Sequence, residues 1–178
     1  MTSYNDFLAG KLSKVTPSGF DVDQLPEYLF DYQAFAVKIA LQHGKFALFA
    51  GTGMGKTSMQ LAWAEMVVNH TNRPVLIVAP LAVAKQTAYD ESAKFGVAVK
   101  YCESQSDVIN GINITNYEKL AKFDPDTFVG VVLDESSILK GFNGKMRTQL
   151  IQSFEFTPYK LACTATPSPN DYIELGNH

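Results

Sequence analysis

A glycine-rich stretch followed by a lysine and a threonine is the first candidate for chemistry in this sequence. Residues 50–57 read AGTGMGKT and lie between an apolar run and a helical pattern. Gly53 and Gly55 can take positive φ, which lets backbone N–H groups curl around phosphate oxygens. Lys56 would place a charge on the β- and γ-phosphates, and the Thr57 hydroxyl would bind Mg²⁺. The pattern predicts a phosphate cradle; the alternative is a glycine-rich turn with an incidental lysine.

Two adjacent carboxylates after an apolar strand are the second candidate. The stretch VVLDESS at 131–137 places Asp134 and Glu135 side by side. Because successive strand residues point in different directions, the two carboxylates can take different roles. We expect Asp134 to hold the Mg²⁺ shell and Glu135 to orient and deprotonate a water. Alone the pair would be read as a solvated turn, but beside a phosphate cradle it predicts hydrolysis rather than transfer to a second substrate.

These residues need a scaffold that brings them together, and the sequence predicts one from alternating strands and helices. Helical spacing marks residues 31–43, 56–70, 81–95 and 144–154, and apolar runs mark strands within 45–50, 74–80, 97–102, 111–117, 128–134 and 159–165. Such alternation predicts an α/β fold, a mostly parallel sheet with helices on both faces. Ligands bind beyond the carboxyl ends of such strands, where both candidate motifs fall.

Composition restricts the class of protein. With 178 residues and a net charge of −3, the chain is expected to be one domain and is not a generally basic nucleic-acid coat, although a local basic groove is compatible with it. Cys102 and Cys163 lack CxxC spacing and a histidine cluster, which argues against a metal site built on them. No apolar window approaches the roughly 18 residues of a membrane span, and no signal peptide is evident. We expect a cytoplasmic, monomeric protein with reduced cysteines and no membrane partner.

In order along nearly the whole chain, the motifs resemble the first motor domain of a superfamily 2 helicase or translocase. The matching stretches are LFDYQ (29–33, the adenine-reading element), AGTGMGKT (50–57, motif I), VAPLAV (around 79–83, motif Ia), ITNYEKL (114–120, motif Ib), DESS (134–137, the DEAD/DEAH box) and TAT (164–166, motif III). Motif I in that family reads A-x-x-G-x-G-K-T, so Ala50 fits. Details of the run are similar to the Swi/Snf-like branch and to DEAD/DEAH-box helicases of phages and prophages.

The resemblance implies a RecA-like P-loop NTPase domain over 1–178, with 1–27 as an N-terminal extension, and the cofactors ATP and Mg²⁺. The implied nucleotide-binding residues are Gln33, Gly51, Thr52, Gly53, Met54, Gly55, Lys56 and Thr57. Lys56, Asp134 and Glu135 would be catalytic, with Thr57 and Asp134 on the metal. Gln33 would read the adenine; the alternative is a polar residue on a helix face. An aromatic among Phe20, Tyr28 and Phe30 would stack on the base, although core packing is the competing reading for each.

The resemblance also implies a nucleic-acid track. Residues that follow strands would contact the phosphate backbone, with turn capping as the alternative: Pro80, Leu81, Thr115 and Asn116. Thr164 and Thr166 would couple the nucleotide site to that track, or would simply finish a strand. Lys140, Lys145 and Arg147 form a basic segment, read as a solvated face with DNA contact as the alternative.

The family's motor also has a second RecA-like domain, with motifs IV to VI and an arginine finger. This chain ends before them, and neither Arg73 nor Arg147 lies in a pattern like that finger. We expect either a fragment of a longer helicase, which the ending within the motif run favours, or a short chain with a separate partner. Since a missing finger can lower the rate on the order of 10³-fold, the isolated chain should hydrolyse ATP slowly.

The expected function is the ATP-binding motor domain of a DNA helicase or translocase. Duplex DNA is favoured over single-stranded DNA, and RNA is an alternative track. A different class remains open, an ATP-dependent switch or binding module without translocation. A small-molecule kinase would need an acceptor pocket and usually an arginine-rich lid, which the presence of only two arginines argues against.

Overall fold

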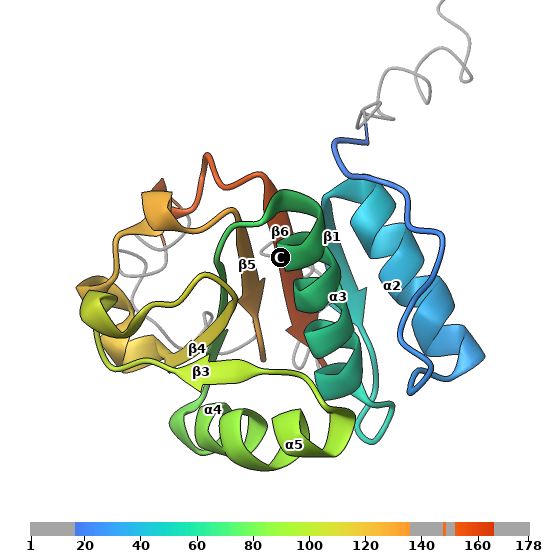
Figure 1. Ribbon diagram of the computed structural model, residues 1–178, viewed down its shortest axis with the longest axis horizontal. Coiled ribbons are helices and arrows are strands. Elements are labelled where there is room, and N and C mark those ends of the chain that lie inside the picture. Colours follow the sequence, from blue (N-terminus) through green and yellow to red (C-terminus); the bar gives the residue numbers. More distant parts are fainter. Residues whose placement is uncertain (1–16, 136–147, 149–151, 166–178) are drawn as a thin grey trace, which may run out of the picture.

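Six parallel strands form one sheet in the spatial order β1-β6-β5-β2-β4-β3 (Figure 1). The structure is a computed structural model that describes residues 17–135, 148 and 152–165. The strands are β1 (Lys45–Phe49), β2 (Val75–Ala79), β3 (Val99–Tyr101), β4 (Ile112–Asn116), β5 (Gly130–Leu133) and β6 (Tyr159–Thr164). Every neighbouring pair runs parallel, which confirms the predicted architecture. The predicted strand ranges exceed the observed ones by one or two residues at their ends.

The helices confirm three of the predicted segments. They are α2 (Asp31–His43), α3 (Lys56–Thr71), α4 (Leu81–Gln86) and α5 (Ser92–Phe95), the last two joined by a π-helical turn (Thr87–Glu91). Three 3₁₀ segments that the sequence patterns do not predict are Gln105–Asp107, Tyr117–Lys122 and Pro125–Thr127. The helix predicted over 144–154 lies mostly outside the described residues. Within the described part of the chain, no helix has the length and apolar character needed to span a bilayer.

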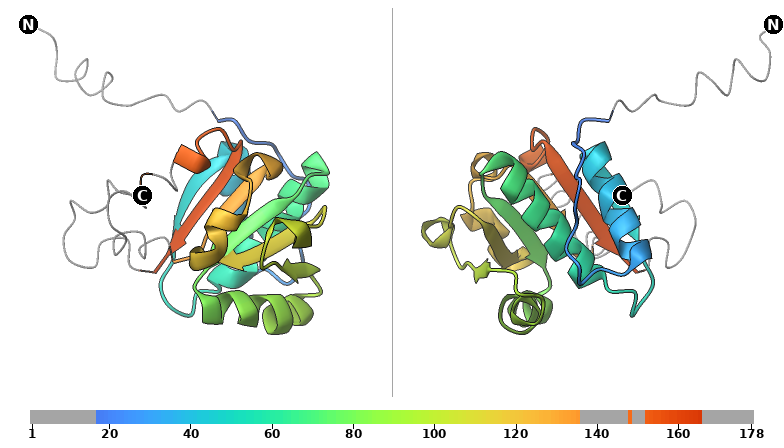
Figure 2. Two further views of the ribbon diagram at one scale, coloured as in Figure 1. Left: turned by 90° about the vertical axis from the view of Figure 1, so that its left-hand side faces the viewer. Right: turned by 45° about the vertical axis from the view of Figure 1, so that its right-hand side comes forward.

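The sheet is covered on both faces, and β2 shows how its side chains are divided. Val75, Ile77 and Ala79 pack with α2 and α3, which lie together over one face (Figure 2, right). Leu76 and Val78 pack on the other face. There the cover comes largely from the 3₁₀ segments and the turn before β6, through Tyr117, Phe123, Phe128 and Phe154. Burial on both faces explains why β2 is apolar throughout rather than alternating.

The described part of the predicted N-terminal extension packs along α2. The N–H groups of Ser18, Gly19 and Phe20 donate to carbonyls in the last turn of that helix. The Phe20 ring stacks on His70 near the C-terminal end of α3, with centroids 3.8 Å apart. Residues 17–20 are therefore bound to the domain at the edge of the sheet opposite to the carboxyl ends of the strands.

The close approach of α3 to β5 depends on a glycine. A Cβ on Gly130 would lie 3.1 Å from a Val75 methyl carbon, 3.3 Å from a Val67 methyl carbon and 3.5 Å from the Trp63 ring. We predict that Gly130→Val lowers the free energy of unfolding by about 1–3 kcal/mol, because the larger side chain overpacks the junction. Gly111→Val is the matched control, since a Cβ there meets only the Ile109 side chain at ordinary contact distance. Urea unfolding of both variants measures the difference, and equal midpoints would contradict the prediction.

Candidate nucleotide site

The loop of residues 50–55 joins β1 to α3 at the carboxyl edge of the sheet (Figure 1). Gly53 and Gly55 both adopt positive φ, 81° and 74°. Gly55 is also the N-cap of α3, which has no side-chain cap and no acidic residue in its first turn. The first N–H groups of the helix and the positive end of its dipole therefore face the loop without a side chain that neutralises them. This arrangement suits an anion such as a phosphate.

Lys56 and Thr57 open α3 directly after the loop. Lys56 Nζ donates a hydrogen bond to the Ala50 carbonyl oxygen, 3.2 Å away, so its side chain lies back across the loop. A phosphate oxygen in the loop would offer Nζ a charged acceptor in place of the neutral carbonyl, and charge-assisted bonds are the stronger kind. The remaining predicted loop residues are exposed to solvent: Gly51, Thr52, Gly53 and Met54.

Asp134 follows β5 and its carboxylate is buried. Its N–H donates to the Val78 carbonyl at 2.8 Å, which extends the strand ladder by one residue. Its Oδ1 accepts a hydrogen bond of 2.6 Å from Gln60 Nε2, on α3. Burial raises the pKa of the Asp134 carboxyl above its usual range, and the charge of Glu135 adds to this, while the Gln60 hydrogen bond and the Lys56 charge oppose it. The site thus holds a desolvated carboxylate at a fixed position.

Glu135 has a left-handed backbone, with φ of 52°, directly after the buried aspartate. Its Oε1 accepts a hydrogen bond of 2.8 Å from Thr164 Oγ1, at the end of β6. Because β6 lies between β1 and β5, the predicted coupling threonine and the predicted water-activating carboxylate meet at one point of the sheet edge. Thr166 lies outside the described residues.

Gln60 and Tyr117 belong to this site but were not named as site residues from the sequence, although Tyr117 lies in the stretch matched to motif Ib (114–120). The Tyr117 hydroxyl donates to the Asp134 carbonyl oxygen at 2.7 Å, and Tyr117 is buried. For Gln60 a signal existed, since it is a polar residue within the run of buried positions that begins α3. For Tyr117 the sequence offers only an aromatic after a strand, and its contact depends on how distant strands are ordered.

The residues that would hold Mg²⁺ are Thr57 and Asp134. Among residues 17–135, 148 and 152–165, no group of three or more His, Cys, Asp and Glu side chains is placed to hold a metal ion. A hydroxyl and one carboxylate are an incomplete set for most metals, but Mg²⁺ commonly binds one or two protein carboxylates together with substrate phosphates and waters. The donor set therefore fits a magnesium ion that arrives with a phosphorylated ligand.

Gln33 contacts the loop of residues 50–55 from the protein side, opposite to its solvent-exposed side. Its Nε2 donates to the Met54 carbonyl at 3.0 Å, and its Oε1 accepts from the Phe30 N–H at 3.0 Å. A Cβ on Gly55 would collide with that Nε2, so the approach of the amide depends on glycine at 55. The structure thus brings Gln33 to the phosphate loop, and its reading of an adenine stays a prediction.

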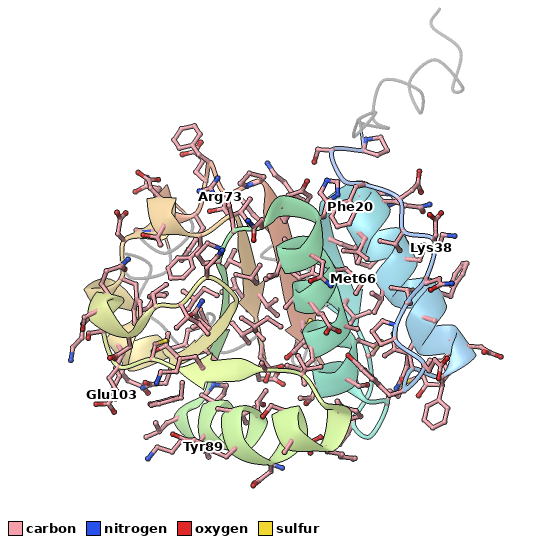
Figure 3. The ribbon with its side chains drawn as sticks, viewed as in Figure 1. Phe20, Lys38, Met66, Arg73, Tyr89 and Glu103 are labelled. Atoms are coloured by element: carbon pink, nitrogen blue, oxygen red, sulfur yellow. The ribbon has the colours of Figure 1, made fainter. Side chains whose placement is uncertain are left out.

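The structure distinguishes the three aromatic candidates for base stacking by their positions relative to the loop. Phe20 lies at the opposite end of α3 from the loop (Figure 3), and Tyr28 packs on Phe95 with centroids 4.9 Å apart, so core packing is the correct reading for both. Phe30 is 68% exposed, and its ring lies 6.1 Å from that of Tyr32, nearly parallel to it. The Tyr32 hydroxyl donates to the Met54 carbonyl at 3.3 Å, which places this pair beside the loop.

The residues predicted to contact nucleic acid are placed unevenly. Pro80 is the N-cap of α4, and Leu81 is 45% exposed. Thr115 is buried with its hydroxyl on the Cys102 carbonyl at 2.9 Å, and the buried Asn116 donates its side-chain amide to the Glu118 carboxylate. In this structure the side chains of Thr115 and Asn116 serve internal hydrogen bonds, and their contact with nucleic acid stays a prediction. The basic segment with Lys140, Lys145 and Arg147 lies outside the described residues.

The buried carboxylate leads to a prediction about stability without ligand. Asp134→Asn keeps an acceptor for Gln60 but removes the desolvated charge, so we expect the melting temperature near pH 7 to rise by about 2–4 °C. Because the folded-state pKa is raised, the charge costs stability above the folded pKa and nothing below the unfolded pKa. The gain should therefore disappear as the pH falls below about 4.

Asp126→Asn is the matched control, because Asp126 is exposed and should give no such gain. Calorimetry of both variants and the wild type across this pH range measures the effect. A lower melting temperature for Asp134→Asn at pH 7 would show that the charge is compensated in the folded protein.

Comparison with known proteins supports this reading of the chain. The family described as ResIII, Type III restriction enzyme, res subunit, matches residues 27–169. Protein p41 of Acyrthosiphon pisum secondary endosymbiont phage 1 is 27% identical over 168 residues, which cover 81% of this chain and 36% of p41. The chain thus spans about a third of the length of this curated relative.

Solved structures of helicase and ATPase domains share the fold. The UvsW helicase from bacteriophage T4 superposes with a TM-score of 0.65 at 19% identity, over 98% of this chain and 64% of UvsW. The Sulfolobus solfataricus SWI2/SNF2 ATPase core in complex with dsDNA gives 0.68 at 22% identity, over 86% of this chain and 35% of that chain. The Pyrococcus furiosus Hef helicase domain superposes with a TM-score of 0.69 at 14% identity, over 86% of this chain and 37% of the Hef chain. With the family match over most of its length, the chain belongs to the ResIII family, and its fold is the RecA-like fold of these helicase and ATPase domains.

Proposed function

We propose that this chain is the ATP-binding motor domain of a DNA helicase or translocase. The observation that carries the proposal is the meeting of three elements at one sheet edge. An uncapped helix N-terminus with Lys56 follows β1, a buried aspartate and an adjacent glutamate follow β5, and Thr164 ends the strand between them. These are the parts needed to bind a nucleoside triphosphate and to activate a water.

In the proposed reaction the loop of residues 50–55 binds the phosphates, and Lys56 donates to the β- and γ-phosphate oxygens. Thr57 and Asp134 would hold Mg²⁺, which would neutralise charge on the phosphates. Glu135 takes a proton from the attacking water, and its hydrogen bond to Thr164 fixes the orientation of its carboxylate. The γ-phosphoryl group is then transferred to this water, with ADP and inorganic phosphate as products.

DNA as the partner is supported by the relatives rather than by a surface of this chain. One structural neighbour was solved in complex with dsDNA, and the curated relative is a phage protein. Duplex DNA is therefore the proposed track, with single-stranded DNA and RNA as alternatives. A second RecA-like domain, in cis or in trans, would complete the motor. With a net charge of −3, this chain alone should make few phosphate contacts, and so its DNA affinity should be low.

The test is steady-state ATP hydrolysis by this chain with and without duplex DNA. We expect slow, Mg²⁺-dependent turnover that rises when DNA is added. Glu135→Gln should lower the turnover by about 10²-fold or more, because the amide cannot accept the proton from water. Glu155→Gln is the matched control, since this exposed glutamate precedes β6 at the opposite edge of the sheet and should leave turnover unchanged.

The outcomes separate the possible functions. Turnover that is unaffected by any nucleic acid would favour an ATP-dependent switch over a motor for this chain. If Glu135→Gln hydrolyses ATP as fast as the wild type, the assigned role of Glu135 is wrong. If the wild type neither binds nor hydrolyses ATP, the proposed function is overturned.

A further inference from the structure

The Tyr117 hydroxyl bridges two parts of the molecule that the proposed reaction does not otherwise connect. Tyr117 is the first residue of the 3₁₀ segment Tyr117–Lys122, directly after β4. In the sheet, β4 is separated from β5 by β2. Yet the hydroxyl donates to the main-chain carbonyl of Asp134, at the end of β5, over 2.7 Å. A residue outside the phosphate loop and the aspartate–glutamate pair therefore contacts the backbone of that pair.

This hydrogen bond acts on the peptide group that joins Asp134 to Glu135. Its carbonyl oxygen accepts from Tyr117, and its N–H, which belongs to Glu135, contributes to lowering the pKa of the Asp134 carboxyl. The Tyr117 hydroxyl thus holds the carbonyl end of this peptide and limits rotation of its plane. The plane in turn sets the φ of Glu135, which is 52°.

A left-handed glutamate is not a relaxed conformation. For a residue with a Cβ this region is less favourable than the right-handed one, so it persists only where the surroundings impose it. Rotation of the Asp134–Glu135 peptide would relieve that cost, and it would change the backbone from which the glutamate side chain reaches Thr164. The Tyr117 hydroxyl opposes this rotation.

Asp134 is held from both faces of the sheet. Its carboxylate is bound by Gln60, which comes from α3 on one face, and its carbonyl by Tyr117, which belongs to the apolar cluster on the other. Of these two contacts, the one from Tyr117 acts directly on the peptide that precedes Glu135. Thr164 holds the Glu135 carboxylate directly, and Tyr117 is placed to hold the backbone from which that side chain extends.

We propose that Tyr117 is a positioning residue for ATP hydrolysis, which acts through the Asp134 carbonyl to hold Glu135 in the conformation that activates water. This proposal rests on the proposed function, since it assigns a role in that same reaction. It also makes the segment after β4 part of the hydrolytic machinery. That segment is covalently joined to Asn116, a residue for which nucleic-acid contact is predicted.

The test removes the hydroxyl alone. Tyr117→Phe keeps the ring that packs on the second face, and Tyr159→Phe is the matched control because Tyr159 begins β6 at the opposite edge of the sheet, where its ring contacts Phe20. Turnover of saturating ATP and affinity for a fluorescent ATP analogue are measured for both, with the Mg²⁺ concentration that gives half-maximal binding of the analogue. Thermal melts check that each variant is folded.

We expect Tyr117→Phe to lower turnover by about 10-fold or more, as for a misplaced catalytic group, while nucleotide affinity at saturating Mg²⁺ stays within about twofold. The half-maximal Mg²⁺ concentration should rise, because Asp134 is no longer held by its carbonyl. In a Glu135→Gln background, single-turnover measurements should show little further loss from Tyr117→Phe, because residues that act as a unit are not additive. Tyr159→Phe should match the wild type throughout.

The inference is overturned if Tyr117→Phe matches the wild type in both turnover and Mg²⁺ dependence. It is also overturned if Tyr117→Phe lowers the single-turnover rate by the same factor in the wild type and in the Glu135→Gln background, because this would indicate a general loss of structure. These outcomes leave the proposed function intact, because wild-type turnover stands in both. If the wild type binds nucleotide with Mg²⁺ but turns none over, hydrolysis by this chain is refuted, and an unchanged Mg²⁺ dependence in Tyr117→Phe then refutes the positioning role as well.

Discussion

The parallel pairing of β1, β6 and β5 is the constraint on which the site depends. Adjacent strands lie about 4.8 Å apart, so their carboxyl ends fall within two strand spacings although the motifs are far apart in sequence. Hydrogen bonds fix the register of β1 against β6. Phe49 lies opposite Thr164, and the Ala50 N–H donates to the Thr164 carbonyl at 3.2 Å. A slip of one residue would turn every side chain of a strand to the other face and separate Thr164 from Glu135.

At this edge of the sheet, a small network of hydrogen-bonded polar side chains takes the place of apolar packing. Gln60, Asp134 and Thr164 are all buried, and each is hydrogen-bonded within the protein. Buried polar groups are costly when unpaired and rigid when paired, so such a network specifies one arrangement more sharply than apolar contacts would. The desolvated Asp134 carboxylate lowers the stability of the fold, but the site to which it belongs is already ordered before any ligand binds.

The sequence predicted what depends on local pattern and missed what depends on strand order. Glycine spacing and apolar runs are local signals, and they located the phosphate loop, the Asp134–Glu135 pair and the parallel sheet. The bond from Tyr117 to Asp134 arises because β4 and β5 both flank β2, which no periodicity reveals. Similarly, Thr115 was predicted to follow a strand, where it could reach a ligand. In the structure β4 continues to Asn116, so Thr115 lies within the strand and its side chain is buried. Phe20 is an aromatic near the adenine-reading element in sequence that the chain path carries to the other end of α3.

The phosphate loop itself combines two different demands on glycine. Gly53 has open space where a Cβ would be, so its requirement is the positive φ alone. Gly55 has a positive φ and also the Gln33 amide where its Cβ would be, so a larger residue there would have to displace that amide. Because Gln33 binds the Met54 carbonyl from behind while residues 51–54 are exposed in front, the loop is supported on the protein side and open on the solvent side. A loop held in this way can present its N–H groups to an anion without paying to order them at the moment of binding.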